Sequence, residues 1–514
     1  MANTLLPPPY KGQNDQFPLI SIQSPYCERM ENFNNLDGVV KVRQGNDLFA
    51  TNATYGNVRD LTSYPNPSSP RLIAMVNENA DFKWYFVTAG SFSLQHTVAG
   101  TWSAIPVTFY FNNYLFYCIA NSGTMIYYNG SAWGNAGYTF GGITFYPYGG
   151  TEFKSRAYMI GGGSAMFGYS GIDAITGAVT LVDLSSQVTN KSLLYMIRPL
   201  SMTQNITSES VLSFIFNTGE ILVYSGSYPD SPNWGRIARF KISKPIYYNA
   251  FVEAKGDSIL LTESEILSLR NLFIGGYDKE RDEGIGSTIN ERWRQIIKAY
   301  SATQLTYITG IYDEKRDRIV IAFPLYVDPS TAATVANTSF QLIYDFNLEA
   351  WYEYYATDAS AVLSECATYH EGDSYLGIAG SAAGYVVKLE GTTNFLDDQL
   401  DGSGTNPIEY SLITAPLPIS KFGANAISGV EAIVKSDLYP QTNYKFIADL
   451  GRQETAAQNL PDQGTSISKP MMNVGIQGAI AAQLEIYGST VSASIGLEIS
   501  ALNVWYNSGD SGSR

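Results

Sequence analysis

Pairs of short strand-like segments recur along the chain between residues 70 and 392, and this repetition constrains the fold more than any other feature. Each pair has a run rich in Tyr, Phe, Ile, Val and Thr, then a turn signal, then a second similar run. This pattern is typical of adjacent antiparallel strands. The first runs of the pairs are Phe82–Val87, Tyr114–Ala120, Arg156–Ile160, Val211–Phe216, Ser258–Thr262, Arg318–Phe323 and Tyr375–Ala379.

The spacing of these units favours one architecture. Counted on the second run of each pair, successive steps are 33, 40, 57, 43, 77 and 43 residues. Three steps lie near the roughly 40–45 residues of a propeller blade, and the two long ones contain insertions. One small sheet cannot bury both faces, whereas a ring of sheets can. We therefore predict an all-β protein whose main body is a β-propeller of about seven blades. An irregular set of hairpins in sandwiches is the alternative, because no WD dipeptide or sialidase Asp-box recurs.

The repeat divides the chain into three predicted parts. Residues 1–69 are expected to form an N-terminal extended or β segment, with a hairpin turn at Asp37-Gly38. Residues 70–392 form the propeller. An acidic linker at 396–404 then leads into a C-terminal β-domain that occupies 393–514. Its predicted strands are Ile408–Thr414, Gly429–Val434, Tyr444–Ala448, Gln483–Tyr487 and Ile495–Tyr506.

One inserted segment near residues 287–301 has helical periodicity. Thr288 and Glu291 have the spacing of a capping box at a helix start. The apolar residues that follow share one helical face; they are Ile289, Trp293, Ile296, Ile297 and Tyr300. We interpret this helix either as a cover packed over a blade or as an interface for a partner.

A dense run of charges directly precedes this helix. Its residues are Asp278, Lys279, Glu280, Arg281, Asp282 and Glu283. Only 15% of the chain is charged, and charges are costly to bury, so the run is predicted to be a loop that faces water, a channel or a polar partner. An exposed loop on the outside and a gating or partner-docking element are both open interpretations.

The composition excludes several kinds of catalytic centre. His96 and His370 are the only histidines, and no partner lies at motif spacing. Cys27, Cys118 and Cys366 lack the spacing of metal ligands and are interpreted as free thiols of a reducing compartment. The sequence contains no G-x-S-x-G, P-loop or H-E-x-x-H motif. We therefore predict a protein that is not an enzyme and that has neither a cofactor nor a metal site.

The charge balance bears on partners. Lys and Arg number 32 against 47 Asp and Glu, for a net charge of −15. A protein that grips duplex DNA needs clustered cations, so this balance argues against gripping and is compatible with letting DNA pass. The N-terminus lacks a basic start followed by an apolar stretch, and no run of about 18 apolar residues occurs. Neither a secretory signal nor a membrane-spanning segment is expected.

Two stretches carry a resemblance to a known family. The first comprises Phe17–Ile20, Cys27–Phe33 and Gly38–Gly45, with an Arg-x-Gly turn at Arg43. The second comprises Thr218–Tyr224, Gly256–Leu261 and Gly286–Glu291. Together they resemble the tail hub, or nozzle, of short-tailed bacteriophages, also described as the packaged-DNA-stabilising protein. The segments Ile408–Thr414 and Gly429–Val434 are similar to the family's closing β-segment, whereas the 77-residue step and residues 397–404 depart from its pattern.

The resemblance implies a structural virion component of the phage tail, assembled in the host cytoplasm. Members of that family are propellers without enzymatic activity that form a ring, usually a hexamer, below the portal and adaptor. The ring extends the DNA channel and retains the genome until ejection. For this chain it implies a homohexamer whose neighbours are the adaptor and tail fibres or spikes. Double-stranded DNA would pass without sequence-specific binding, because acidic walls repel phosphate.

A carbohydrate-binding or carbohydrate-cleaving propeller, such as a receptor-binding phage protein, is the alternative function. The chain has 37 Tyr and 7 Trp residues, which suit stacking against sugars. Such a protein would bring aromatic side chains and carboxylates together at one end of one propeller. A hub would instead present large side faces to its neighbours.

Overall fold

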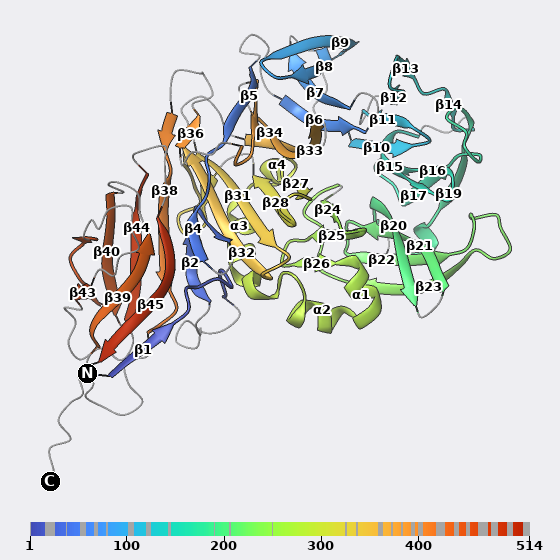
Figure 1. Ribbon diagram of the computed structural model, residues 1–514. Coiled ribbons are helices and arrows are strands. Elements are labelled where there is room, and N and C mark those ends of the chain that lie inside the picture. The colour runs from blue at the N-terminus through green and yellow to red at the C-terminus, as the bar shows by residue number, and fades with distance from the viewer. Residues whose placement is uncertain are drawn as a thin grey trace.

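The computed structural model describes the chain apart from a set of short segments. The residues outside the description are 1, 16–25, 37–38, 52–57, 66–69, 79–80, 101–106, 120–124, 142–144, 190, 205–206, 249, 324–325, 336–337, 358–362, 372–373, 382–383, 392–395, 399–404, 418–426, 436–440, 449–452, 461–470, 474–481, 491–496 and 507–514. The described chain forms a β-propeller with a β-sandwich at its side (Figure 1).

Seven small antiparallel sheets form the blades of the propeller, which confirms the predicted fold class. Blades 1 to 4 have four strands each. Blade 1 consists of β6 (Val58–Tyr64), β7 (Arg71–Glu78), β8 (Asp81–Thr88) and β9 (Ser91–Ala99), and blade 2 of β10 (Val107–Phe111), β11 (Tyr114–Cys118), β12 (Met125–Tyr128) and β13 (Trp133–Asn135). Blade 3 consists of β15 (Pro147–Phe153), β16 (Arg156–Gly161), β17 (Met166–Tyr169) and β19 (Thr180–Asp183). Blade 4 consists of β20 (Leu194–Gln204), β21 (Thr207–Phe216), β22 (Glu220–Ser225) and β23 (Gly235–Lys241).

Blades 5 to 7 complete the ring, and the last one is closed by the N-terminal part of the chain. Blade 5 has three strands, β24 (Phe251–Ala254), β25 (Asp257–Leu261) and β26 (Ile266–Ser268). Blade 6 consists of β27 (Thr309–Asp313), β28 (Arg318–Phe323), β31 (Thr338–Asp345) and β32 (Ala350–Thr357). Blade 7 consists of β33 (Leu363–Glu371), β34 (Ser374–Ser381), β35 (Tyr385–Lys388) and, as its outer strand, β5 (Asp47–Thr51).

Apolar side chains fill the interface between each pair of neighbouring blades, which is why the ring can bury both faces of every sheet. Phe167 of blade 3 and Phe214 of blade 4, for example, have ring centroids 4.6 Å apart. At one position near the axis, neighbouring blades 5 and 6 approach so closely that a glycine is needed. A Cβ atom at Gly310 of β27 would lie 2.4 Å from a methyl group of Val252 in blade 5.

The β-sandwich is built from both ends of the described chain. One sheet has the order β3 (Phe33–Leu36), β4 (Val39–Val42), β45 (Glu498–Tyr506), β39 (Ile427–Lys435) and β43 (Met471–Asn473), with β1 (Ala2–Leu6) also on β45. The other contains β2 (Cys27–Glu31), β38 (Glu409–Thr414), β44 (Ala482–Ser489), β40 (Gln441–Ala448), β41 (Gln453–Glu454) and β42 (Gln458–Asn459). Through a parallel pairing of β2 with β32, this second sheet is continuous with blade 6.

The strand pairing does not follow the predicted boundary between residues 69 and 70. The segment 1–69 is not a separate unit, because it supplies β1 to β4 to the sandwich, β5 to blade 7 and β6 to blade 1. The propeller accordingly begins well before residue 70. The sequence could not reveal this, because β1, β2, β4 and β5 pair with strands hundreds of residues away. Asp37-Gly38 lies outside the described residues, although β3 and β4 on either side pair antiparallel as a hairpin requires.

Helices cluster beside blade 5, where the single predicted helix proves to be one of several. They are α1 (Leu269–Gly275), α2 (Tyr277–Glu283), α3 (Asn290–Ala299) and α4 (Ala302–Leu305), with 3₁₀ turns at η3 (Ser287–Ile289) and, in blade 3, η2 (Ser185–Gln187). Leu269 and Leu272 of α1 pack against Leu260 and Leu267 of blade 5, which has no fourth strand. Among the described residues, no helix has the length and apolar character needed to cross a membrane.

Three further strand pairs lie in the connections. They are β14 (Tyr138–Thr139) with β18 (Gly177–Ala178), β29 (Tyr326–Asp328) with β30 (Ala333–Val335), and β36 (Leu396–Asp398) with β37 (Thr405–Pro407). The described part of the predicted acidic linker is strand β36, which pairs with β37 just after the linker, and Asp397 in β36 is buried.

Candidate functional site

The predicted charged loop is helix α2, which corrects the expectation of a loop exposed throughout. Asp278, Lys279, Asp282 and Glu283 are exposed, but Glu280 is only 3% exposed. The Glu280 carboxylate accepts a 2.7 Å hydrogen bond from the backbone of Ser268, which ties α2 to the end of β26. Burial raises the pKa of Glu280. Arg281 forms ion pairs with Asp278 and Asp282 on its own helix.

The predicted helical face is buried against the propeller. Ile289, Trp293, Ile296, Ile297 and Tyr300 all belong to the apolar cluster between blades 5 and 6. The indole Nε1 of Trp293 donates a 2.8 Å hydrogen bond to the carbonyl of Thr262. On the neighbouring side, the Arg292 guanidinium donates to the buried Glu353 carboxylate of β32 at 2.6 and 2.9 Å. Within one chain, α3 therefore covers a blade.

The start of α3 differs from the sequence prediction, because no capping box forms at Thr288. The N-cap position is Ile289, which has no side-chain cap. Instead, the carboxylate of Asp15 accepts a hydrogen bond from the backbone N–H of Arg292. The backbone N–H of Asp15 in turn donates to the carbonyl of Thr288 at 2.7 Å. Burial raises the pKa of Asp15 to about 6. The N-terminal segment thus supplies the cap, and no local spacing announces it.

A groove of about 690 Å³ lies beside α2. Asp282 and Glu283 of α2 line it, together with Lys255 and Arg270 from the neighbouring segments of blade 5 and α1. The ammonium group of Lys255 is held by Asp317 at 2.7 Å and lies 4.5 Å from the ring centre of Phe346. Two members of the predicted charged run are therefore brought to a polar groove.

The second cavity is the axial channel of the propeller, with a volume of about 670 Å³. Residues from the first strand of all seven blades line it. Since each blade is an antiparallel meander that begins at the axis, these inner strands begin at one end of the channel and finish at the other. None of the residues 277–283 or 287–301 lines it.

Tyrosines gather at the end where the inner strands begin. Tyr247 and Tyr248 precede β24, and Tyr307 precedes β27. The ring of Tyr248 lies 4.7, 4.4 and 5.2 Å from the rings of Tyr247, Tyr195 and Tyr148 respectively. We call these five residues the tyrosine cluster: Tyr148, Tyr195, Tyr247, Tyr248 and Tyr307. All are half-buried.

The opposite end of the channel carries carboxylates. Glu152, Glu253 and Glu314 lie in the second half of, or just after, three inner strands, whereas Asp60 lies in the first half of β6. The Glu253 side chain is 67% exposed and pairs with Arg198, the one cation that lines the channel among the described residues. The guanidinium of Arg198 also lies 3.8 Å from the ring centre of Phe251 and donates to Ser258 at 3.2 Å. Burial lowers the pKa of Arg198 to about 9, so it stays charged at neutral pH.

Among the described residues, burial and the hydroxyl of Thr62 are the influences on the Asp60 carboxyl. Its carboxylate accepts a 2.8 Å hydrogen bond from the hydroxyl of Thr62. Burial raises the pKa of Asp60 to about 7. This carboxyl is therefore partly protonated at neutral pH, unlike an ordinary aspartate.

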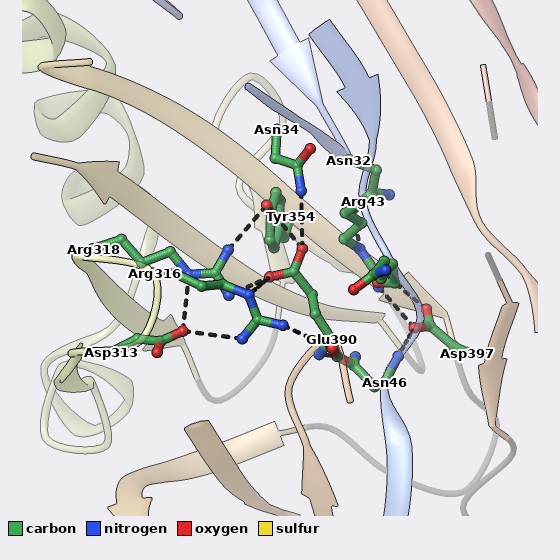
Figure 2. Close-up of polar contacts among 11 residues, drawn as sticks. Asn32, Asn34, Arg43, Asn46, Asp313, Arg316, Arg318, Tyr354, Glu390 and Asp397 are labelled. Carbon is green, nitrogen blue, oxygen red and sulfur yellow. Dashed lines mark hydrogen bonds and ion pairs between the residues drawn. The ribbon is translucent and has the colours of Figure 1, made fainter. Parts of the chain in front are cut away.

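Figure 2 shows a buried polar network where the sandwich meets blades 6 and 7. The Arg43 guanidinium donates to both carboxylate oxygens of Asp397, at 2.8 and 2.6 Å. Its Nε donates to Asn32 Oδ1 at 2.9 Å, and that oxygen also accepts from the backbone of Tyr355 at 2.8 Å. Asn32 has a left-handed backbone (φ 56°) at the point where the chain passes from β2 to β3, which lie in different sheets. We call this contact region the junction.

Glu390 is the second anchor of the junction (Figure 2). It forms ion pairs with Arg318 and Arg316, and it accepts hydrogen bonds from Tyr354 and Asn34 at 3.3 Å each. Burial alone would raise the pKa of Glu390, but Arg318 and Arg316 outweigh it and lower that pKa. The junction therefore joins the sandwich to the propeller through charges that are buried and paired.

Histidine, cysteine and acidic side chains are dispersed in the described part of the chain. No group of three or more His, Cys, Asp and Glu side chains there could hold a metal ion. Cys27 and Cys118 are buried free thiols, and burial raises the pKa of both. His96 stacks on Trp133 with ring centres 5.4 Å apart.

The comparisons with known proteins place the chain in no family. No family model matches it, and no curated protein matches it. A solved streptogramin B lyase is similar at 11% identity and a TM-score of 0.40, covering 67% of this chain and 96% of that one. An exo-β-1,3-galactanase from Phanerochaete chrysosporium, solved with β-1,3-galactotriose, is similar at 11% identity and a TM-score of 0.29, covering 90% of this chain and 99% of that one. At these TM-scores neither likeness carries an argument about this chain.

Proposed function

We propose that this protein is a structural subunit of a phage tail, a hub or nozzle that forms a ring and extends the DNA channel. The proposal rests on where the structure puts two residues of the N-terminal stretch that resembles tail hubs. Asn32 and Arg43 belong to the resembling N-terminal stretch, and both lie at the buried junction between sandwich and propeller. The similarity thus falls on residues that fix how the two parts are joined.

The side faces of the propeller are also those that a ring subunit needs. The outer strands of blades 1, 3 and 4, namely β9, β19 and β23, are largely exposed. Blades 5 and 6 are instead covered by helices and by the sandwich. Exposed edge strands are surfaces that proteins usually protect or pair, so one side of the propeller is available to neighbouring subunits.

The other elements of the proposal follow from this role. The partners are further copies of the chain, most simply six in a ring, the adaptor, and tail fibres or spikes. The site of action is the virion. The proposal includes no catalytic step, and the absence of enzymatic activity stays a prediction.

Helix α2 is the proposed contact with the next tail component or with the lumen of the ring. Its exposed carboxylates are Asp278, Asp282 and Glu283, whereas Glu280 is buried and structural. A variant with Asp278→Asn, Asp282→Asn and Glu283→Gln therefore tests the contact without removing the helix. Complete particles that leak DNA support a gating role. Particles that assemble and keep their DNA show that α2 has none.

Electron micrographs of the purified full chain test the hub directly. Closed rings with an open centre are expected, and their connection to the tail of phage particles should be visible with an antibody against the chain. Single propellers at every concentration, together with particles that do not bind the antibody, would contradict the proposal.

A second candidate function, carbohydrate binding, is favoured by one observation. Aromatic rings and carboxylates converge on the axial channel of a single propeller, from several blades. A sugar-binding propeller is expected to bring both kinds of side chain to one end; here they share one channel, with the tyrosines at one end and most of the carboxylates toward the other. A ring subunit does not require such a channel. Binding of saccharides by the purified chain, measured by calorimetry, separates the two functions, which are also compatible in one protein.

A further inference from the structure

We propose that the axial channel binds the end of a neutral oligosaccharide, with the tyrosine cluster as its entrance. The inference rests on the second function proposed above and is independent of ring formation. It assigns the ligand class, the site and the direction of entry.

The entrance is built for the apolar faces of a sugar ring. Tyr248 is packed against Tyr195 and Tyr247, with ring centres 4.4 and 4.7 Å away, so its orientation is set before a ligand arrives. In the neighbouring blade 6, Tyr307 is held by the Arg59 guanidinium, 5.3 Å from its ring centre. Half-exposed, immobilised aromatic rings offer apolar area at low entropic cost. The C–H faces of a pyranose ring match such surfaces.

Further along the channel wall, a donor and an acceptor lie side by side. The guanidinium of Arg198 is a fixed fork of donors on Phe251, and the exposed carboxylate of Glu253 lies next to it. Adjacent hydroxyl groups of a sugar can donate to the carboxylate and accept from the guanidinium. Thr62, Thr108 and Thr306 add further hydroxyl groups to the wall.

Charge and volume select among ligands. Four carboxylates and one guanidinium line the channel, which disfavours phosphate and other polyanions, including DNA. A volume of about 670 Å³ lies in the roughly 300–1,000 Å³ range of small-molecule sites. A few sugar units fit this range, whereas a folded partner or a duplex does not. A neutral polyhydroxylated ligand uses both the aromatic and the polar walls.

The experiment is a screen of the full-length chain on an array of neutral hexose oligosaccharides, followed by calorimetry with the best binder. Tyr248→Ala and Tyr307→Ala should each weaken binding at least tenfold, and Tyr307→Phe should retain it. Tyr146→Ala is the matched control, because Tyr146 is a 39% exposed tyrosine that does not line the channel. Thermal unfolding identifies any variant that fails to fold, and the remaining variants carry the test.

The outcomes separate the site from the function. If no oligosaccharide binds at millimolar concentration, both the inference and the second function are wrong. If an oligosaccharide binds equally well to folded Tyr248→Ala and Tyr307→Ala variants, sugar binding stands and the channel is not its site. If the oligosaccharide is cleaved, the channel is not a simple binding site and the inference fails.

Discussion

The guanidinium of Arg43 donates two parallel hydrogen bonds to the carboxylate of Asp397, at 2.8 and 2.6 Å, across 354 residues of sequence. Arg43 follows the N-terminal hairpin of the sandwich, and Asp397 follows the last blade of the propeller. The Arg43 side chain is 2% and the Asp397 side chain 10% exposed. This pair therefore fixes the two ends of the propeller segment to each other.

Breaking this pair should destabilise the whole protein. Asp397→Asn leaves the Arg43 cation buried without its counter-charge, which typically costs about 3–5 kcal/mol. Urea unfolding should show this loss. Glu291→Gln is the control, since the Glu291–Arg294 pair is 55% and 47% exposed and such pairs contribute about 0–1 kcal/mol. Equal effects of both substitutions would mean that the junction pair adds no stability.

Trp293 should contribute to stability as a core residue. It is fully buried and bonded to Thr262, and Trp→Ala in a core typically costs about 3–5 kcal/mol. A clear fall in the melting temperature is expected for Trp293→Ala, and almost none for the exposed Lys298→Ala on the same helix. An unchanged melting temperature combined with lost ring formation would instead identify α3 as an interface.

Asp60 should make stability depend on pH. Its pKa rises from 3.8 to about 7 on folding, so between these values the folded state holds a proton that the unfolded state has lost. Stability from this group is therefore highest near pH 4 and falls as the pH rises to about 7. Asp60→Asn removes this contribution, and the difference in unfolding free energy between pH 5 and pH 8 should shrink.

The control for this experiment is Asp282→Asn. Asp282 is fully exposed, and the side-chain hydrogen bond from Arg281 lowers its pKa. This substitution should leave the difference between pH 5 and pH 8 unchanged. The same difference in wild type and Asp60→Asn would show that Asp60 is ionised like an ordinary surface aspartate.

Two glycines with the same backbone conformation separate strain from close packing. Gly219 has φ +81° and a Cβ there would lie 2.2 Å from the Ile242 carbonyl, whereas Gly90 has φ +80° with nothing within 4 Å. Gly90→Ala should cost about 1–2 kcal/mol from the left-handed backbone alone. Gly219→Ala should cost more, because the backbone of Ile242, just after β23, must also move. Equal losses in urea unfolding would contradict the tight turn at Gly219.

The local parts of the fold could be predicted from the sequence. The seven strand pairs follow from alternating aromatic and β-branched runs, and six of them are the second and third strands of their blades. In blade 1 the predicted pair is β8 and β9, the third and outer strands, which explains the short step of 33 residues. The buried face of α3 also follows from its periodicity.

The long-range parts could not be predicted. Strand β5 closes blade 7, β1 to β4 complete the sandwich, and Asp15 caps α3, each by contacts with distant residues. The helices α1 and α2 have seven residues each, which is too short for a periodic hydrophobic pattern. Because five other charged residues surround Glu280 in the sequence, nothing indicated that this one would be buried. One sequence pattern could have predicted the tyrosine cluster, because its members all lie at or just before the start of an inner strand: Tyr148, Tyr195, Tyr247, Tyr248 and Tyr307.

The mass of the assembled protein tests the central claim most directly. One chain has a mass of 56.3 kDa. Native mass spectrometry of the purified full-length protein over a series of concentrations should give a single closed assembly, with six copies expected. A species of 56.3 kDa that persists at the highest concentration, and also in the presence of the purified tail adaptor, would contradict a ring-forming hub.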